Sequence, residues 1–336
     1  MREPPFWWRP PGISSRLLAP LGAVYGAAAA RRLVVAGARV AAPVICIGNP
    51  TVGGAGKTPV AITVAAMLKA AGERPAFLTR GYGGREGGPL RVDAERHRAT
   101  EVGDESLLLA RVAPTIVAHD RVRGAQAALA AGASVIVMDD GFQNPSLRKD
   151  VAVLVIDAAR GLGNAQVLPA GPLRAPLPAQ LACAHAVVVV GRGTAAAQIA
   201  AAARARDIAV FAAHLVPDPK AVAAVKGNRI LAFAGIGDPA KFFATLRASG
   251  LALAETRSFA DHHRYSLREA KKLREAADRR GLLLMTTEKD LARLRGEPAG
   301  SELVRAVHTL PVALVFDDEV SFRTFLFGRL SAARTL

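Results

Sequence analysis

Cysteine is scarce in this sequence. The 336 residues include Cys46 and Cys183 and no further cysteine, and both lie in apolar runs. So few cysteines exclude a disulfide scaffold, and we expect buried, reduced thiols in a cytosolic protein rather than a bridge or a metal site. Hydrophobic residues make up 51% and charged residues 21% of the chain, which excludes extended disorder and allows one large or two modest cores.

Long hydrophobic runs are also missing. The longest uncharged stretch near the N-terminus, residues 17–30, is too short to span a bilayer and is interrupted by Pro20. The run Trp7-Trp8-Arg9-Pro10-Pro11 comes before it, which is not the layout of a cleaved signal peptide. Aromatic and aliphatic residues between 6 and 32 are flanked by arginines. This segment predicts a helix lying in a membrane interface or, alternatively, a helix packed on the protein's own core.

Acidic residues are too few to balance the basic ones. Lysine and arginine total 44 and aspartate and glutamate 28, so the formal net charge is +16. Such an excess attracts polyanions, including nucleic acid, an anionic membrane surface and phosphorylated small molecules. Because the charges are scattered and form no nucleic-acid-binding motif, we expect no nucleic-acid partner. Genomic base composition is an alternative explanation for part of the arginine excess.

Short apolar runs alternate with helical patterns along the chain. Continuous apolar runs predict strands covered on both faces, and their repetition with helices predicts a parallel, doubly wound sheet. After a break near residues 216–220, a second α/β series begins, and it ends with a strand at 310–316 and a last helix. The elements expected before the break are strands at 44–47, 76–78, 115–118, 134–138, 151–156 and 186–190, and helices at 57–71 and 120–131.

The turn after the first strand has the composition of a phosphate-binding loop that ends in Gly56-Lys57-Thr58. In such loops glycines let backbone N–H groups surround the β-phosphate, and the helix N-terminus adds partial positive charge. The lysine reaches the β and γ oxygens, and the hydroxyl ligates Mg²⁺. The usual first glycine is Thr51 here, and Gly53-Gly54 supplies flexibility. The alternative is a glycine-rich turn that binds nothing.

The same loop separates the chain from one other class of P-loop protein. ATPases with a deviant loop carry an extra lysine just before the two glycines, and that position is Val52 here. The sequence therefore predicts a P-loop NTPase-type parallel sheet flanked by helices. Three parts are expected: an N-terminal membrane-interface helix in residues 1–36, a P-loop kinase core in 37–220 and a smaller C-terminal α/β lobe in 221–336.

Several acids and histidines are candidates for the chemistry. Asp139 and Asp140 end an apolar strand, where an acid beside a P-loop holds Mg²⁺ directly or through water; the alternative is a solvated turn. Asp104 precedes a helical pattern and, on its own, is read as a helix cap. The adjacent His262 and His263 in the second lobe are typical of a surface loop. Across a cleft, one of them could assist deprotonation of an acceptor hydroxyl.

Taken together, these segments resemble the tetraacyldisaccharide 4′-kinase family, the lipid A 4′-kinases of Gram-negative bacteria. The resemblance covers nearly the whole chain, and the family's loop also has a threonine where Thr51 stands. Besides the loop at 48–59, the similar segments, in the family's order, are 79–83, 103–105, 119–121, 139–143, 168–174, 261–263 and 287–290.

The resemblance implies ATP- and Mg²⁺-dependent phosphorylation of the 4′-hydroxyl of a tetraacylated glucosamine disaccharide 1-phosphate. It implies peripheral binding to the anionic, cytoplasmic face of the inner membrane, and we expect a monomer. Asp104 would be the base, paired with His262. The metal would be organised by Thr58, Asp139 and Asp140, with Glu105 near it. The nucleotide and substrate phosphates would contact Thr51, Gly53, Gly54, Ala55, Gly56, Lys57, Thr58, Arg121, Gln143 and Arg174.

Two other functions remain open at this stage. The chain could be a P-loop ATPase switch that docks on a membrane partner and has no acceptor. It could also be a non-catalytic, basic membrane-binding protein. The lipid substrate favours the kinase. Its acyl chains gain about 0.8 kcal/mol per CH₂ from burial in the bilayer and do not leave it, so the enzyme must come to the membrane. An interfacial helix and a basic surface would bring it there.

Overall fold

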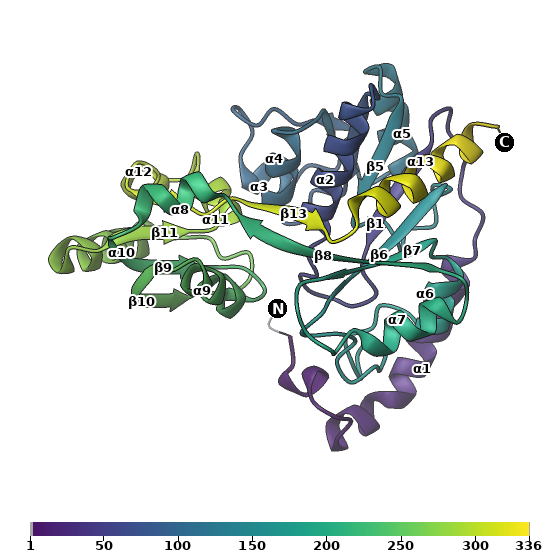
Figure 1. The fold of residues 1–336 in the computed structure, drawn as a ribbon, viewed down its shortest axis with the longest axis horizontal. Coiled ribbons are helices and arrows are strands. Elements are labelled where there is room, and N and C mark those ends of the chain that lie inside the picture. The colour runs from purple at the N-terminus through teal and green to yellow at the C-terminus, as the bar shows by residue number, and fades with distance from the viewer. Residues whose placement is uncertain (1–2, 336) are drawn as a thin grey trace.

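The computed structural model describes residues 3–335 (Figure 1). It contains a nine-stranded sheet with helices on both faces and a smaller lobe built on a four-stranded sheet. The predicted α/β fold, with a mostly parallel sheet flanked by helices and a smaller second lobe, is confirmed. The first two residues of the predicted segment 1–36 and the last residue of 221–336 lie outside the described residues.

The large sheet has the strand order β13-β8-β7-β6-β1-β5-β2-β4-β3. Neighbouring strands are parallel except for two antiparallel pairs, β3 with β4 and β8 with β13. In chain order the strands are β1 (Val44–Gly48), β2 (Pro75–Thr79), β3 (Leu90–Arg91), β4 (Thr115–Val117), β5 (Val135–Asp139), β6 (Val151–Asp157), β7 (Ala186–Val190), β8 (Ala209–Pro217) and β13 (Val312–Phe316).

Two helical layers bury the large sheet. Successive β1 residues point to opposite faces, so Ile45 and Ile47 join one core and Val44 and Cys46 the other. Cys46 is buried as predicted, Cys183 is half-buried, and neither forms a disulfide. The first layer contains α2 (Lys57–Ala70), α4 (Asp104–Ala110) and α13 (Glu319–Thr335); α3 (Ala99–Val102) precedes α4, and the second layer contains α5 (Arg121–Ala130), α6 (Leu177–Ala182) and α7 (Ala197–Arg204).

The smaller lobe has an all-parallel sheet in the order β10-β9-β11-β12. Its longest helix starts at a capping box formed by Ser266 and Glu269 and ends at Gly281, which has a left-handed conformation. The lobe consists of α8 (Pro219–Val225), β9 (Arg229–Ala234), α9 (Pro239–Ala248), β10 (Ala252–Ser258), α10 (Leu267–Arg280), β11 (Leu283–Thr286), α11 (Glu288–Leu294), α12 (Gly300–Leu303) and β12 (Val307–Thr309).

The C-terminal segment does not belong to this lobe, which corrects the prediction for 221–336. β13 pairs with β8 in the large sheet, and α13 buries Phe322, Leu326 and Leu330 against that sheet. The smaller lobe is thus an insertion between β8 and β13, which run side by side between the two parts (Figure 1). An apolar strand pattern does not say which sheet it joins, so the sequence alone could not place residues 312–335.

The N-terminal segment forms a short 3₁₀ turn, η1 (Pro5–Trp8), and then α1 (Ile13–Leu33). The helix predicted over 6–32 therefore starts later, because Pro10, Pro11 and Gly12 interrupt it. One narrow face, containing Gly22 and Gly26, packs against residues 167–176; a Cβ at Gly22 would lie 2.9 Å from the Val167 carbonyl oxygen.

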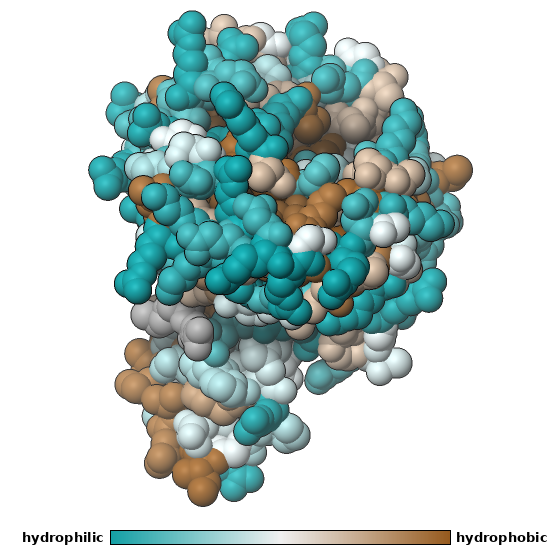
Figure 2. All heavy atoms as spheres, turned by 90° about the vertical axis from the view of Figure 1, so that its left-hand side faces the viewer, coloured by the Kyte–Doolittle hydropathy of each residue, from teal (hydrophilic) through white to brown (hydrophobic). Residues whose placement is uncertain are grey.

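The opposite face of α1 is apolar and exposed. Ile13, Leu17, Leu21 and Val24 are each at least 60% exposed. Figure 2 shows brown, apolar side chains gathered at the bottom of the molecule, where Figure 1 places α1. Within residues 3–335, no helix has both the length and the apolar composition of a transmembrane span. The apolar row of α1 is therefore not buried on the protein's own core.

Candidate active site

The loop that joins β1 to α2 has the backbone of a phosphate-binding loop. Gly53 and Gly56 have φ angles of 90° and 89°, which a side chain would strain. The 14-residue α2 starts at Lys57, so the positive end of its dipole lies at the loop. The Lys57 ammonium donates to Asn49 Oδ1 at 3.1 Å and lies 3.8 Å from Asp140 Oδ1. The loop therefore combines two left-handed glycines at a helix N-terminus with a fixed cation.

Asp139 is the last residue of β5 and lies against the start of α2. Its Oδ2 accepts a hydrogen bond from Thr58 Oγ1 at 3.1 Å, while its buried Oδ1 has no hydrogen-bond partner. Burial and the nearby charge of Glu105 raise the pKa of Asp139 to about 7, although Lys57 opposes them. A buried carboxylate oxygen that accepts no hydrogen bond, beside a hydroxyl, is suited to a cation.

Asp140 faces a different set of partners. Its carboxylate lies 3.1 Å from Arg174 Nη1, and its backbone φ of 55° turns it away from the strand direction. Burial would raise the pKa of Asp140, but Lys57 and Arg174 outweigh it and lower the pKa below its ordinary value. Asp140 is thus already neutralised by cations, whereas Asp139 is not.

These residues fit Mg²⁺. A hydroxyl and one carboxylate oxygen, completed by phosphate oxygens and water, are the donors that Mg²⁺ takes in P-loop proteins. Across residues 3–335, no group of three or more His, Cys, Asp or Glu side chains is arranged to hold a metal by itself. Thr58 and Asp139 are the residues that would hold such an ion.

The two adjacent acids are expected to affect stability in opposite directions when replaced by asparagine. Because the folded-state pKa of Asp139 is raised, stability is lost as pH rises from about 4, the unfolded value, to about 7. At pH 8, Asp139→Asn should therefore raise the Tm. Asp140→Asn should lower the Tm. Because the folded-state pKa of Asp140 is lowered, its carboxylate stabilises the fold at any pH above its unfolded-state pKa.

Thermal melts with and without Mg²⁺–ATP check this pair of expectations. Binding to the folded state raises the wild-type Tm, and the Mg²⁺-dependent part of that rise should disappear in Asp139→Asn. Transfer activity should fall by at least about 10²-fold in the same variant. A lower Tm for Asp139→Asn in the absence of nucleotide would contradict the reading of its carboxylate as an uncompensated charge.

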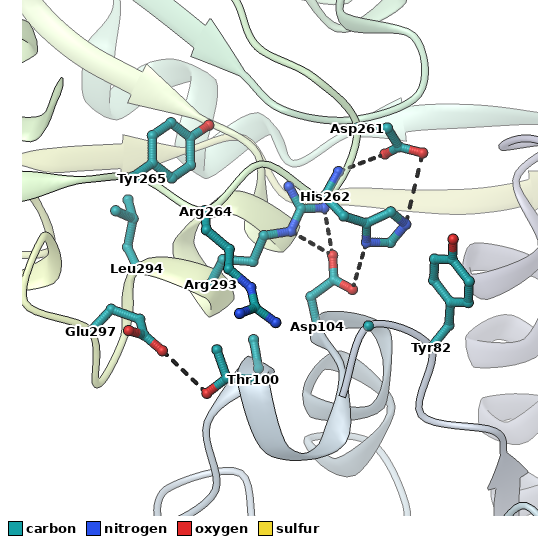
Figure 3. A pocket seen from close by; sticks show the side chains of 12 residues that line it. Tyr82, Thr100, Asp104, Asp261, His262, Arg264, Tyr265, Arg293, Leu294 and Glu297 are labelled. Carbon is teal, nitrogen blue, oxygen red and sulfur yellow. Dashed lines mark hydrogen bonds and ion pairs between the residues drawn. The ribbon is translucent and has the colours of Figure 1, made fainter. Parts of the chain in front are cut away.

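Asp104 and His262 form a pair between the two parts of the molecule (Figure 3). Asp104 is the first residue of α4 and does not cap it; its carboxylate is 3% exposed, and Oδ1 lies 3.3 Å from His262 Nδ1. His262 has a φ of 53°, an uncommon conformation for histidine. Tyr82 packs edge-on against its ring, with centroids 5.0 Å apart.

Charge strengthens this pair. Burial would raise the pKa of Asp104, but hydrogen bonding to His262 and the charges of Arg293 and Lys289 outweigh it and hold the pKa well below its usual range. Burial would lower the pKa of His262, but the hydrogen bond to Asp104 and the charges of Asp104 and Asp261 outweigh it. The pKa of His262 therefore lies above its ordinary value. The two pKa shifts run in opposite directions, as expected for an ion pair between the carboxylate and the imidazole.

The structure separates the two adjacent histidines. His263 stacks on Phe259 within the smaller lobe, and its Nε2 lies 3.2 Å from Glu269 Oε1. His262 points instead across the cleft to Asp104 (Figure 3). The geometry thus favours His262, as the sequence analysis expected.

Two neighbouring cavities meet at this pair. One, of about 470 Å³, lies beside Asp104 and extends to Arg264 and Glu297. The other, of about 420 Å³, lies over the phosphate loop and reaches Tyr25 of α1. Both cavities are lined by Tyr82, Asp261 and His262. A phosphate on the loop and a group in the first cavity would therefore meet beside His262.

Comparison with known proteins gives the family. A family model described as tetraacyldisaccharide-1-P 4′-kinase matches residues 14–331. The chain belongs to the tetraacyldisaccharide-1-P 4′-kinase family. The curated tetraacyldisaccharide 4′-kinase of Nitrobacter winogradskyi is 54% identical over 336 residues, all of both chains, and that of Nitrobacter hamburgensis is 55% identical over 334 residues, 99% of this chain and 100% of the relative. The resemblance noted from the motifs is confirmed.

A solved structure of the family also matches the fold. The "apo" form of LpxK from Aquifex aeolicus in complex with ATP superposes with a TM-score of 0.72 at 25% identity, covering 94% of this chain and 99% of that chain. The α/β architecture described above, with its mostly parallel sheet, is thus the architecture of a family member that binds ATP.

Most of the residues that the family resemblance suggested lie together. Gln143 donates to the Asn49 carbonyl at 3.0 Å, Arg174 donates to the Thr51 carbonyl at 2.9 Å, and Glu105 pairs with Lys289 at 2.5 Å. Residues of the predicted set that line the cavity over the loop are Gly53, Gly54, Lys57, Glu105, Asp140, Gln143, Arg174 and His262.

Other predicted residues do not line that cavity. Thr51 and Ala55 are buried. Arg121 was expected to line the active site, but it is buried at the start of α5 and donates to the Thr79 and Ala118 carbonyls. The carbonyls of Thr79 and Ala118 hold its guanidinium, and its contact with a ligand stays a prediction. Arg121 borders neither of the two cavities.

Sequence reasoning missed two cations of α11. Lys289 and Arg293 lie one helical turn apart and pair with Glu105 and Asp104, respectively. The segment 287–290 had been noted only as similar to the family, without a role. An available signal was the spacing of four residues between a lysine and an arginine, which puts both on one face of a helix. Nothing in the sequence indicated which acids they would meet.

Proposed function

We propose that this chain is an ATP-dependent kinase that phosphorylates the 4′-hydroxyl of a tetraacylated glucosamine disaccharide 1-phosphate, a step of lipid A biosynthesis. The observation that carries the proposal is a convergence. The phosphate loop and Asp140, which directly follows β5, share one cavity with His262, which belongs to the other lobe and is paired with Asp104. Nucleotide binding alone does not require that second lobe, whereas transfer to an acceptor does.

The loop residues would bind and orient the nucleotide phosphates. Backbone amides of Gly53 and Gly54 and the ammonium of Lys57 line the cavity and supply positive charge where phosphoryl transfer builds negative charge. Arg174, which pairs with Asp140, lines the same cavity. Mg²⁺ held by Thr58 and Asp139 would neutralise phosphate oxygens when bound.

The proton of the acceptor hydroxyl would pass to the Asp104–His262 pair. His262 is 28% exposed on its side chain and borders both cavities, whereas Asp104 is almost completely buried. Asp104 fixes the imidazole orientation through Nδ1 and, together with it, takes the proton as the acceptor oxygen attacks. Such a positioned base contributes about 10²–10⁴-fold to the rate.

The acceptor's acyl chains explain the exposed row on α1. We propose that Ile13, Leu17, Leu21 and Val24 insert into the interface of an anionic bilayer, at the cytoplasmic face of the inner membrane, and that the monomer binds there peripherally. The net charge of +16 favours the anionic surface. Tyr25 of the same helix borders the cavity over the phosphate loop, so the membrane helix and the reaction site are adjacent.

A double variant of α1 tests the membrane contact. Leu17→Gln with Leu21→Gln should weaken partition to anionic vesicles by about tenfold or more, since each buried leucine contributes roughly 1.5–3 kcal/mol. Both side chains are at least 60% exposed, so the fold and the Tm should be kept. The matched control, Val315→Gln with Val320→Gln, changes exposed apolar residues far along the chain and should leave partition unchanged. Equal partition of both double variants would rule out the α1 row.

The function itself is tested with purified full-length protein, detergent micelles, the disaccharide 1-phosphate and ATP labelled in the γ-phosphate. We expect label at the 4′-position of the lipid, located by mass spectrometry. Phosphate release that is the same with and without the disaccharide, and no labelled lipid, would instead indicate an ATPase switch. Protein without ATP binding or turnover would indicate a non-catalytic membrane-binding protein.

A further inference from the structure

One helix of the smaller lobe meets the start of α4 with two cations. Lys289 and Arg293 of α11 pair with Glu105 and Asp104, which are neighbours in the first turn of α4. Lys289 and Arg293 are four residues apart on α11, and Asp104 and Glu105 are adjacent on α4. The two ion pairs therefore hold α11 against α4 at two points. The smaller lobe therefore contacts the proposed base directly as well as through His262.

Arg293 is held from both sides. Its Nε donates to Asp104 Oδ2 at 2.8 Å, and Nη2 donates to the same oxygen. Its Nη1 donates to Asp290 Oδ1 at 2.9 Å and to the Gly235 carbonyl. Arg293 is 7% exposed, and Asp290 is completely buried. The guanidinium thus has little freedom to move.

Asp290 in turn is fixed by several donors. The Tyr265 hydroxyl donates to its Oδ1 at 2.8 Å, and the Gly235 amide donates to it at 3.1 Å. Both donors belong to the smaller lobe, as does Arg293. A rigid network of that lobe therefore ends in two N–H groups on a single oxygen of Asp104.

We propose that Arg293 is a positioning residue for phosphoryl transfer, which fixes Asp104 through Oδ2 so that Oδ1 faces His262. With Oδ2 occupied twice, only Oδ1 is left for the imidazole (Figure 3). Without Arg293 the carboxylate could rotate about its χ angles, and the imidazole would lose its fixed partner. This inference rests on the proposed kinase function.

A purely structural role for Arg293 is the competing explanation. Removing one member of a buried ion pair destabilises a protein by leaving a charge uncompensated. A structural role lowers stability and the fraction of folded enzyme, but it leaves kcat per ATP-binding site unchanged. The two explanations therefore differ in kcat per binding site, and in how variants at 293 and 104 combine in that quantity.

The test is a double-mutant cycle. The variants are Arg293→Gln, Arg293→Lys, Asp104→Ala and the double variants, with rates expressed per ATP-binding site titrated by calorimetry. Arg293→Gln should lower kcat about 10²-fold, the effect expected from misplacing a catalytic group by about 1 Å, with the KM for ATP within about twofold. Arg293→Lys, which keeps one charged donor, should recover at least about tenfold of that loss. In the Asp104→Ala background, neither substitution should lower kcat further.

Arg295→Gln is the matched control. Arg295 is exposed, follows α11 and makes no ion pair in the part of the chain that the structure describes. The kcat of the Arg295→Gln enzyme should therefore stay within about twofold of wild type. Losses that add in the double variants, or an Arg293→Gln rate within about threefold of wild type, would overturn the inference. If Arg293→Gln does not fold, Arg293→Lys in the two Asp104 backgrounds decides by the same criterion. Failure of the kinase function itself would appear differently, as wild-type protein that labels no lipid.

Discussion

Replacing Asp104 with asparagine is expected to lower kcat by about 10²–10⁴-fold while leaving the dissociation constant of ATP nearly unchanged. The amide keeps the size of the side chain but cannot share a proton with His262, whose Nδ1 lies 3.3 Å from Asp104 Oδ1. Asp104 is not among the residues that line the cavity over the phosphate loop, so nucleotide binding should not depend on it. Steady-state transfer assays and calorimetric ATP titrations measure the two quantities separately.

The control for this variant is Asp207→Asn. Asp207 is exposed and has a φ of 56°, which asparagine tolerates well, so neither activity nor ATP binding should change. A His262→Ala variant should resemble Asp104→Asn, and the double variant should be little worse than either one, because the two residues act as a unit. If Asp104→Asn lost ATP affinity and kcat in equal measure, Asp104 would have a role at the metal or the phosphates instead.

Features of this site that are formed by residues close together in the sequence could be predicted from it. The phosphate loop is a local feature, since a buried strand, glycines and Gly56-Lys57-Thr58 at a helix start fix one another within about a dozen residues. Asp139 and Asp140 were predictable for the same reason, because carboxyl ends of neighbouring parallel strands meet at one edge, and β5 pairs with β1.

Features that join distant segments were not predictable in this way. Arg293 meets Asp104 across 189 positions of sequence, and an arginine on a charged helix is ordinarily solvated. The pairing of β8 with β13 depends on a lobe inserted between them, so a linear division at residue 220 could not find it. Periodicity predicts that a strand is buried but does not identify its neighbour in the sheet.

Arg121 shows what chain position leaves undetermined. The resemblance suggested a basic residue that contacts ligand, and its motif lies at the carboxyl end of β4, on the correct edge of the sheet. The side chain, however, turns inward and donates to backbone carbonyls at that edge. Chain position gave the right neighbourhood, but the direction of a long side chain depends on which partners surround it in three dimensions.

Replacing Lys57 with alanine is expected to impair both binding and chemistry, in contrast to Asp104→Asn. The ammonium is 9% exposed on its side chain and held by Asn49 at the floor of the phosphate loop. Loss of a charge-assisted hydrogen bond, worth about 1.5–3 kcal/mol, should weaken ATP binding by about 10–10²-fold. Since charge on the γ-phosphoryl oxygens is greatest during transfer, kcat should fall by a further 10²–10³-fold or so.

The control lies on the same helix. Lys69→Ala removes an exposed lysine near the end of α2, whose Nζ donates only to the Val112 carbonyl, and it should leave ATP affinity and kcat within about twofold of wild type. Lys57→Ala should also release Asp140 from one of its two cations, so a slightly lower Tm is expected without nucleotide. If Lys57→Ala bound ATP as tightly as Lys69→Ala, the amides at 53–58 would not be the site of the phosphates. The proposed kinase function would then fail, because it requires a γ-phosphate bound at the loop, between the acids and the Asp104–His262 pair.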